Sequence, residues 1–262
     1  MDAVVRIAGA EPWSAPGDAV RGRTGIIVTH GFTGNPLGTR PLGQRLAAEG
    51  YTVEVPLLPG HGTNHRDLGQ TRYQDWVDSV ERVLDHLLEG CDQVVLVGHS
   101  MGGTITLDIA SRRPGDVAAV VVINPVVLDR TDPLAKVAFI LQYLIPYLPR
   151  DLAGMPTNDI AIPGAEEGAY AMVSAKAAQS FIAELPRVRS RLLDLVQPLL
   201  VIRSPADHTV PPDNSTELVE LVGSPDVREI VCDRSFHSPQ IDYDAEKVEE
   251  AVVAFVAEFA GG

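Results

Sequence analysis

Val97-Gly98-His99-Ser100-Met101-Gly102-Gly103 stands between an apolar run, residues 93–97, and a stretch of helix-forming residues. An apolar run of this length is typical of a buried strand, so the glycines fall where a strand turns sharply into a helix. In such a turn the residues two positions before and after the central one come close together, and only small residues fit. Gly98 and Gly102 meet this requirement. The stretch therefore predicts a strand–turn–helix junction that lifts the Ser100 hydroxyl clear of the sheet.

Short apolar runs alternate with longer amphipathic stretches along most of the chain. Strands that alternate with helices of ten or more residues predict an α/β fold, with a mostly parallel sheet and helices on both faces. The expected strands are residues 25–29, 51–56, 93–97, 117–123, 198–203 and 227–232, and the expected helices are 40–49, 76–88, 101–112, 212–222 and 248–259.

Residues 129–189 interrupt this alternation. They contain several prolines, no recognisable strand and an apolar run at 137–145. Long excursions from a compact fold usually carry function. We therefore expect 129–189 to be a helical insertion that acts as a lid over the ends of the strands, with simple packing as the alternative. Residues 1–128 and 190–262 then form one core.

Ser100 requires partners if it is to act as a nucleophile. A serine hydroxyl is a weak nucleophile, and it needs a base and a third group that orients the base. In this architecture the acid and then the histidine follow the serine, each in a loop after a later strand. Asp207 follows the expected strand 198–203, and His237 follows the last strand. Ser100, Asp207 and His237 are the predicted catalytic residues.

Other residues remain candidates for two of these roles. His208 could be the base, although adjacent side chains diverge and its loop already carries the acid. Asp233 could pair with the base, although its position is typical of a turn. Asp129 and Asp132 follow the strand after the serine turn, where the acid lies in some enzymes of this architecture.

Two backbone amides are expected to stabilise a negatively charged oxygen near the serine. One belongs to Met101, the residue after the nucleophile. The other belongs to the loop after the strand 25–29, where Gly31 and Gly34 permit a tight path and the Phe32 amide is the natural donor.

Composition and charge exclude several kinds of partner. Hydrophobic residues make up 45% and charged residues 21%, which is typical of a globular protein. Thirty-five acidic and 21 basic residues give a net charge of −14 without a basic cluster, which disfavours nucleic acids and anionic membranes. No residues have metal-ligand spacing and no glycine-rich loop fits a nucleotide, so we expect no metal and no cofactor. His30 and His61 are expected to be structural hydrogen-bonding residues, and Cys91 and Cys232 small core residues at strand ends.

The first residues and the lengths of the apolar runs bear on where we expect the protein to reside. The first residues, MDAVVRIAGAEPW, lack the basic and apolar regions of a signal peptide. No apolar run reaches the roughly 18 residues that a membrane span requires. We expect a cytoplasmic protein without a stable membrane anchor, either a monomer or a homodimer.

Six segments, in order, resemble the α/β-hydrolase superfamily, and most of all its bacterial carboxylesterases and monoacylglycerol lipases. They are HGFTGNP at 30–36, GYTVEVPLLPGHGTNH at 50–65, DWVDSVE at 75–81, GHSMGGT at 98–104, ADHTVPP at 206–212 and SFHSPQIDYD at 235–244. The resemblance covers almost the whole chain. It implies an α/β-hydrolase fold, the same three catalytic residues and the same two amide donors. It also implies that 129–189 is a cap whose apolar helix and loops bind the acyl chain.

The expected substrate contacts are neighbours of these groups and members of the apolar run of the cap. They are Gly31, His99, Phe139, Leu144 and Ile145. The predicted function is that of a serine ester hydrolase that forms an acyl-enzyme from small-molecule esters with short- to medium-chain acyl groups, monoacylglycerols among them.

Substrate choice is left open at this stage. Some monoacylglycerol lipases of this group carry a glutamate after an Ala-Tyr pair, whereas here Ala171 follows Ala169-Tyr170. The same triad also serves thioesterases, perhydrolases and C–C bond hydrolases, because neither fold nor triad determines the substrate. A protein of another class, a catalytically inactive ligand-binding protein with this fold, is the remaining alternative.

Overall fold

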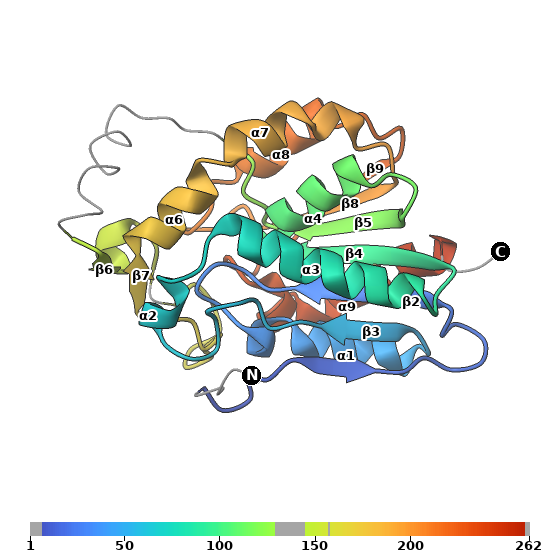
Figure 1. The fold of residues 1–262 in the computed structure, drawn as a ribbon, viewed down its shortest axis with the longest axis horizontal. Coiled ribbons are helices and arrows are strands. Elements are labelled where there is room, and N and C mark those ends of the chain that lie inside the picture. The colour runs from blue at the N-terminus through green and yellow to red at the C-terminus, as the bar shows by residue number, and fades with distance from the viewer. Residues whose placement is uncertain (1–6, 129–144, 157, 260–262) are drawn as a thin grey trace.

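A seven-stranded sheet forms the centre of the molecule in the computed structural model, which describes residues 7–128, 145–156 and 158–259 (Figure 1). The strand order is β1-β3-β2-β4-β5-β8-β9. The strands are β1 (Trp13–Ala15), β2 (Thr24–Thr29), β3 (Thr52–Val55), β4 (Gln93–His99), β5 (Val117–Ile123), β8 (Leu199–Arg203) and β9 (Val227–Val231). β1 is antiparallel to β3, and the other neighbouring pairs in this sheet are parallel. The expected mostly parallel sheet is confirmed.

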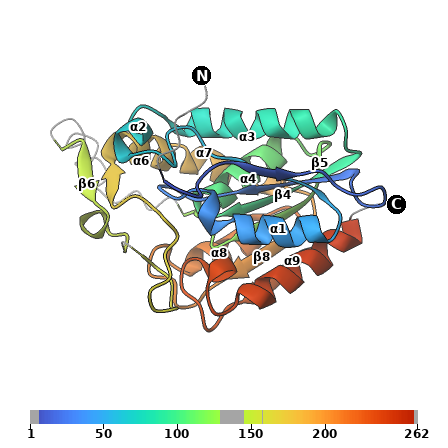
Figure 2. The ribbon, with the colours of Figure 1, turned by 90° about the horizontal axis from the view of Figure 1, so that it is seen from below.

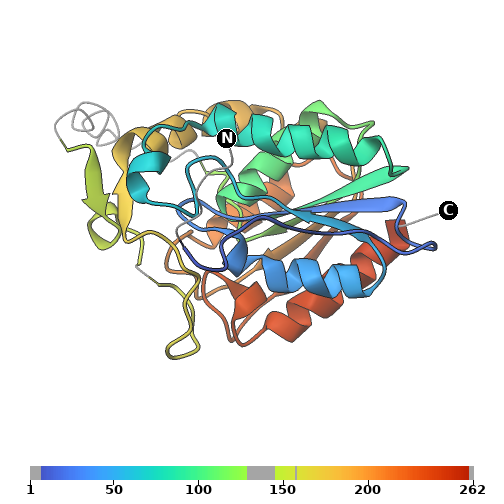
Figure 3. The ribbon, with the colours of Figure 1, turned by 60° about the horizontal axis from the view of Figure 1, so that its bottom comes forward.

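Helices cover both faces of this sheet (Figure 2). α1 (Arg40–Ala48) and α9 (Ala245–Phe259) pack on one face, and α3 (Tyr73–Leu88), α4 (Met101–Arg112) and α8 (Asp213–Leu221) pack on the other. Figure 3 shows the strands running between these two helical layers. Because both faces are covered, β2 is buried along its whole length, as expected for a parallel strand in a sheet of this kind.

The structure corrects the expectation that residues 129–189 contain no strand. β6 (Tyr147–Pro149) and β7 (Met172–Ser174) pair as a separate antiparallel sheet, followed by α6 (Ala175–Ile182) and α7 (Leu185–Ser190). Strands of three residues are too short to show a periodic pattern, so the sequence did not indicate them. Among the described residues, the remaining short helices are η1 (Pro36–Gly38), α2 (His65–Leu68), η2 (Asp151–Ala153), η3 (Leu192–Asp194) and η4 (Pro239–Ile241).

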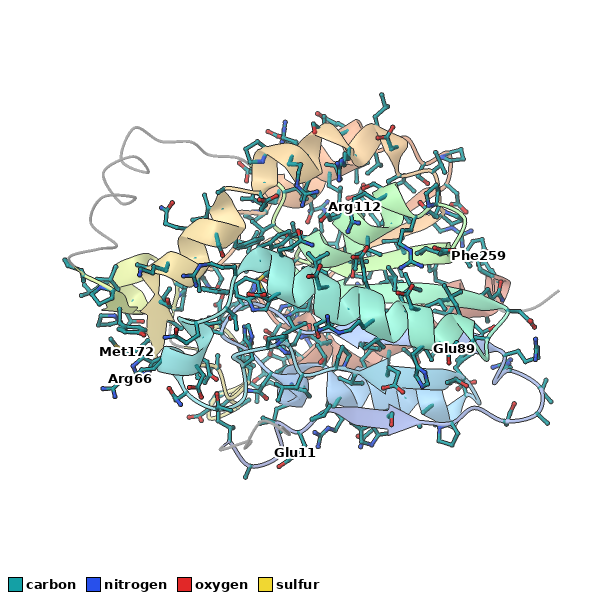
Figure 4. All side chains as sticks on the ribbon, viewed as in Figure 1. Glu11, Arg66, Glu89, Arg112, Met172 and Phe259 are labelled. Atoms are coloured by element: carbon teal, nitrogen blue, oxygen red, sulfur yellow. The ribbon has the colours of Figure 1, made fainter. Side chains whose placement is uncertain are left out.

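The described part of the insertion lies beyond the carboxyl ends of the parallel strands, where β6, β7 and α6 appear together in Figure 1. α2 packs against β7 there, and Figure 4 labels Arg66 and Met172 from these two elements. The loops that follow β2, β4, β8 and β9 therefore open toward the insertion. Within the described residues, no helix is both long enough and apolar enough to cross a membrane.

Both cysteines are free and lie next to strands, as expected. Cys91 is half-buried two residues before β4, and Cys232 is fully buried directly after β9. Burial raises the pKa of the Cys232 thiol to about 12. This thiol therefore stays protonated and unreactive at neutral pH.

Candidate active site

Ser100 occupies a strained turn between β4 and α4. Its φ of 56° and ψ of −121° lie outside the regions that residues with side chains usually adopt. A Cβ atom added to Gly98 would lie 2.3 Å from the carbonyl oxygen of Gly102, and one added to Gly102 would lie 2.3 Å from that of Thr29. The predicted need for glycine at both positions is confirmed. The Ser100 amide donates a hydrogen bond to the Ile123 carbonyl (2.9 Å), which ties the turn to β5.

The structure brings Asp207 and His237 into direct contact. Nδ1 of His237 lies 2.8 Å from Oδ2 of Asp207. A carboxylate can only accept, so Nδ1 carries the proton and donates, and Nε2 is left as the basic nitrogen. Oδ1 of Asp207 accepts hydrogen bonds from the backbone amides of Thr209 and Val210 at 2.8 and 2.7 Å. The carboxylate is thereby held in one orientation toward the imidazole.

The surroundings of His237 favour its charged form. Burial by itself lowers the pKa of the imidazole, but the charge and hydrogen bond of Asp207 outweigh it, and the charges of Glu167 and Asp159 act in the same direction. The pKa of His237 is therefore raised above its ordinary value. An imidazole in this state readily takes up a proton from a neighbouring hydroxyl.

Ser100 and His237 line one narrow cavity, together with Gly31 and Phe32. Two unused backbone donors lie next to the serine. Within the described part of the chain, no group accepts a hydrogen bond from the Phe32 or Met101 amide. Met101 is the first residue of α4, so its amide also carries the positive end of the helix dipole. These amides are suited to bind a negatively charged oxygen.

The other candidates for acid and base lie differently. His208 turns its Nδ1 to Oδ1 of Asp159 at 2.8 Å, away from the acid that precedes it. Asp233 is exposed after the end of β9. Asp129 and Asp132 fall outside the described residues.

His99 and Asn124 hold the backbone of the predicted base. Nε2 of His99 donates to the His237 carbonyl at 3.0 Å, and Nδ2 of Asn124 donates to the same oxygen at 2.8 Å. Burial, followed by the charge of His237, lowers the pKa of His99 to about 4, so His99 stays neutral. Asn124 was not singled out from the sequence, although a polar residue directly after an expected strand is the signal that could have found it.

Residues 158–170 of the insertion form a strap that crosses the loops of the site. Its Asp159 carboxylate accepts hydrogen bonds from the His208 amide and the Thr209 hydroxyl, both at 3.0 Å. The Asp159 carbonyl accepts a hydrogen bond from the His237 amide at 3.1 Å. The strap is therefore bonded to the loops that carry the predicted acid and the predicted base.

The far end of the strap is bonded to the other side of the site. Nδ2 of Asn35 donates to the Gly168 carbonyl at 2.8 Å, and the Tyr170 amide donates to the Thr33 carbonyl at 3.0 Å. The Tyr170 hydroxyl donates to the Gly60 carbonyl at 3.0 Å. Nothing in the sequence indicated these contacts, because they join segments far apart in the chain through single polar groups.

His30 and His61 make the hydrogen bonds expected of structural residues. The Leu58 amide donates to Nε2 of His30 at 3.1 Å, and Nδ1 of His30 donates to the Gly31 carbonyl at 2.9 Å. Nδ1 of His61 donates to the Pro59 carbonyl at 3.1 Å. Both rings are buried and stay neutral, since burial lowers the pKa of His30 well below its ordinary value and that of His61 to about 4.

A second cavity, of about 270 Å³, also reaches Ser100. It shares Phe32, Met155 and Thr209 with the narrow cavity, and the rest of its lining is mostly apolar. The apolar part is formed by Val126, Leu128, Ala153, Val173, Ala178, Phe181, Ile182, Val210 and Pro211. The site thus has an apolar side and a more polar side that meet at the serine.

The expected substrate contacts are distributed unevenly. Gly31 and His99 line the narrow cavity. Ile145 is 44% exposed and lines neither cavity. Phe139 and Leu144 lie outside the described residues. No group of three or more possible metal ligands comes together in the part of the chain that the structure describes.

Comparison with known families agrees with this geometry. The family model described as "Serine aminopeptidase, S33" (Hydrolase_4) matches residues 21–244, most of the chain. The chain belongs to this α/β-hydrolase family. The expected family and fold are therefore confirmed.

Two curated relatives match this α/β-hydrolase over nearly their whole length. It is 34% identical over 255 residues to the thermostable monoacylglycerol lipase of Bacillus sp. (strain H-257), with 97% of each chain covered. It is 26% identical over 238 residues to a carboxylesterase of Bacillus subtilis (strain 168), with 90% of this chain and 93% of the relative covered. The α/β-hydrolase described here is thus a homologue of lipases and esterases.

Solved structures support the same placement. A structure from work on the metagenome-derived lipolytic enzymes LipS and LipT superposes with a TM-score of 0.88 at 30% identity, covering 96% of this hydrolase and 99% of that chain. The monoacylglycerol lipase of Paleococcus ferrophilus superposes with a TM-score of 0.76 at 19% identity, covering 95% and 99%. At that lower identity the likeness concerns the fold alone.

Proposed function

We propose that this hydrolase is a serine carboxylic-ester hydrolase that cleaves short- to medium-chain acyl esters of small alcohols, monoacylglycerols among them. The observation that carries the proposal is the meeting of an apolar and a more polar cavity at Ser100. An ester bound there would place its acyl chain among apolar side chains and its alcohol on the polar side. A volume of about 270 Å³ lies near the lower end of ligand-binding pockets, which favours acyl chains of modest length. The relatives named as monoacylglycerol lipase and carboxylesterase support the same class.

In the first half of the proposed reaction Ser100 becomes acylated. Oγ attacks the ester carbonyl carbon, and its proton passes to Nε2 of His237. Asp207 holds the imidazole through Nδ1 and stabilises its positive charge. The Phe32 and Met101 amides donate to the oxyanion of the tetrahedral intermediate. Collapse of this intermediate breaks the bond to the alcohol, which leaves with the proton from Nε2.

The second half returns the enzyme to its starting state. A water molecule gives a proton to Nε2 of His237 while its oxygen attacks the acyl carbon. The same two amides stabilise the second oxyanion. The proton then passes to Ser100 Oγ as the carboxylic acid is released. The chemistry requires no metal or cofactor.

The same proposal assigns the two parts of the chain. Residues 1–128 and 190–262 form the hydrolase core, and 129–189 form a cap that contributes to the substrate cavity. The position of β6, β7 and α6 beyond the strand ends supports this division. The contribution of Val173, Ala178 and Phe181 to the apolar cavity supports it as well.

Replacement of the nucleophile tests the mechanism. Ser100→Ala is expected to lower kcat on p-nitrophenyl butyrate by about a million-fold, as in other serine enzymes that lose the nucleophile. A phosphonate that forms a covalent bond to active serines should label the wild-type chain at Ser100 and leave the variant unlabelled. Wild-type turnover in the variant would refute the mechanism. A folded wild-type chain that resists labelling would favour the inactive, ligand-binding alternative.

A chain-length series tests the assignment of the apolar cavity. Ala178 of α6 lines that cavity, so Ala178→Phe should reduce the volume of the cavity. The variant should lower kcat/KM for decanoate esters about tenfold more than for butyrate esters, because each lost methylene contact is worth about 0.8 kcal/mol. Ala183→Phe, at an exposed position that ends the same helix, is the matched control. Equal effects on both esters would place the acyl chain elsewhere. The same series with monoacylglycerols and acyl thioesters separates a lipase from a thioesterase.

A further inference from the structure

Glu167 has no role in the triad mechanism, yet it lies in the same cavity as Ser100, His99 and His237. We propose that Glu167 is a positioning residue that holds the loop of His237 and favours the cationic imidazole formed when Ser100 is deprotonated. The inference rests on the proposed function, because it concerns the same base.

The contacts of Glu167 connect it directly to the loop that carries the base. Oε2 of Glu167 accepts a hydrogen bond from the Ser238 hydroxyl at 2.9 Å, and Ser238 is the residue after His237. Oε1 lies 3.3 Å from the Arg150 guanidinium. All three side chains are buried, with Arg150 2%, Glu167 9% and Ser238 1% exposed. Each oxygen of the carboxylate therefore has a buried polar partner, one of them in the base loop.

Glu167 retains its negative charge in this position. Burial by itself raises the pKa of the carboxyl, but Arg150, the two neighbouring imidazoles and the Ser238 hydroxyl lower it below its ordinary value. A buried ion pair of this kind costs free energy of desolvation, so its presence is not explained by stability alone. Here the pair borders the cavity where the chemistry is proposed to occur.

Charged and titratable groups face His237 from three directions. Asp207 contacts it from the loop after β8, Glu167 and Asp159 act from the strap, and His99 packs against it from β4 with ring centroids 4.7 Å apart. His99 is neutral, so it offers no negative charge to balance an imidazolium. Three carboxylates are thus available to balance it: Asp207 in direct contact, Glu167 through the base loop, and Asp159 from the strap. Glu167 takes up no proton, which moves only between Ser100 Oγ and Nε2 of His237.

Two single variants separate the charge of Glu167 from its hydrogen bond. Glu167→Gln removes the charge while an amide oxygen can still accept from Ser238. Ser238→Ala removes the hydrogen bond and keeps the charge. The double variant Arg150→Gln/Glu167→Gln removes both charges together, so it provides a folded comparison if a lone buried guanidinium unfolds the single variant. The full chain is used throughout.

Two readouts are taken from each protein. The first is the NMR titration of the His237 ring, assigned with His237→Gln, which requires no turnover. The second is the pH profile of kcat/KM for p-nitrophenyl butyrate, whose acid limb reports the free base. A wild-type chain without esterase activity would refute the proposed function and still leave the titration to test the role of Glu167.

Loss of the Glu167 charge should shift the titration of His237 and the acid limb to lower pH in Glu167→Gln and in the double variant. Plateau kcat should fall about tenfold, the factor that corresponds to one unit of pKa. Ser238→Ala should lower kcat without moving the limb. If the titration of His237 did not move in Glu167→Gln and in the double variant, the proposal would be overturned. Glu167 would then have a purely structural role. If the acid limb of the pH profile moved equally in Ser238→Ala, the shift could not be assigned to the charge of Glu167.

Discussion

Ser100 adopts a backbone conformation that costs about 1–3 kcal/mol for a residue with a side chain. The surrounding chain keeps it there. The Ser100 amide is bonded to β5, and the two flanking glycines let the backbone of the turn contact itself and β2. This arrangement makes Ser100 part of the lining of both cavities. The strain in the turn and the access of both cavities to Ser100 therefore have the same origin.

Gly102→Ala tests this account of the turn. Its Cβ would lie 2.3 Å from the Thr29 carbonyl oxygen, a backbone atom that cannot move without displacing β2. We expect the substitution to lower the free energy of unfolding by about 3 kcal/mol or more, as for other overpacked sites, and to abolish activity. Urea denaturation and turnover are the measurements.

Gly115→Ala is the matched control. A Cβ at Gly115 meets no atom within 4 Å, and the position has no positive φ. Here alanine should stabilise the chain by about 0.4–1 kcal/mol, because it restricts the unfolded state. If both variants behaved alike, the close approach at Gly102 would not be what determines the residue there.

The residues of the candidate site differ in how readily the sequence indicates them. Ser100, Asp207 and His237 could be singled out because each follows a strand, and the structure brings them to one site, while their catalytic roles stay a prediction. Glu167 and Asp159 could not be predicted, because they lie in the insertion, where no strand end marks a position. Their importance depends on contacts that form only when the insertion folds against the core.

At the scale of elements, the longer strands and helices could be predicted and the shortest could not. α3 spans sixteen residues with one apolar face, and β4 and β5 each span seven. β1, β6 and β7 span three residues each and are formed through pairing with a neighbour rather than through local preference. The edge strand β1 and the small sheet β6–β7 were therefore absent from the expected fold.

A buried carboxylate connects α4, which follows the Ser100 turn, to α7. Asp108 of α4 is fully buried and accepts two hydrogen bonds from the Arg187 guanidinium, at 3.1 and 3.0 Å. Arg112, labelled in Figure 4, adds a contact at 3.2 Å within α4, and Arg191 lies 3.8 Å away. Three guanidinium groups therefore surround one carboxylate. Through Arg187, this group joins the insertion to α4.

Asp108→Asn is expected to destabilise the fold by about 1–3 kcal/mol, since three partly exposed guanidinium groups lose the buried carboxylate that they share. Urea denaturation followed by far-UV circular dichroism measures the change. Asp92→Asn provides the control, because the Asp92–Arg23 pair is exposed and its loss should leave the midpoint unchanged. Comparable losses in both variants would contradict a special role for the buried cluster.

At the scale of the whole molecule, buried neutral histidines determine how the fold responds to acid. His30, His61 and His99 are buried, and each has a pKa lowered chiefly by burial. Unfolding returns each imidazole to water, where it binds a proton near its ordinary pKa of about 6.5. Below that pH the unfolded state binds more protons than the folded state. The contribution of these neutral imidazoles to the free energy of unfolding is therefore fully present above about pH 6.5 and is lost as the pH falls toward their pKa values in the folded state.

His61, with a pKa of about 4, is expected to cost the fold about 2 kcal/mol at pH 5 relative to neutral pH. The urea midpoint of the wild-type chain should accordingly fall between pH 7 and pH 5. His61→Gln should be less stable at pH 7, because it loses packing against Trp76 and Tyr170, and should show a shallower fall with acid. A variant with the wild-type slope would show that another group is responsible.

The strap also determines how this hydrolase can be recombined with its relatives. Its hydrogen bonds join the insertion to the loops of the predicted acid, the predicted base and the predicted oxyanion donor. A chimera that exchanges residues 129–189 as a block would therefore replace part of the lining of the apolar cavity and the groups bonded to the loop of the predicted base in one step. A graft that retains Arg150 and residues 158–170, and exchanges only the remaining segments, keeps Asp159, Glu167 and the ion-pair partner of Glu167. Exchange boundaries placed inside the insertion, rather than at its ends, therefore preserve these hydrogen bonds.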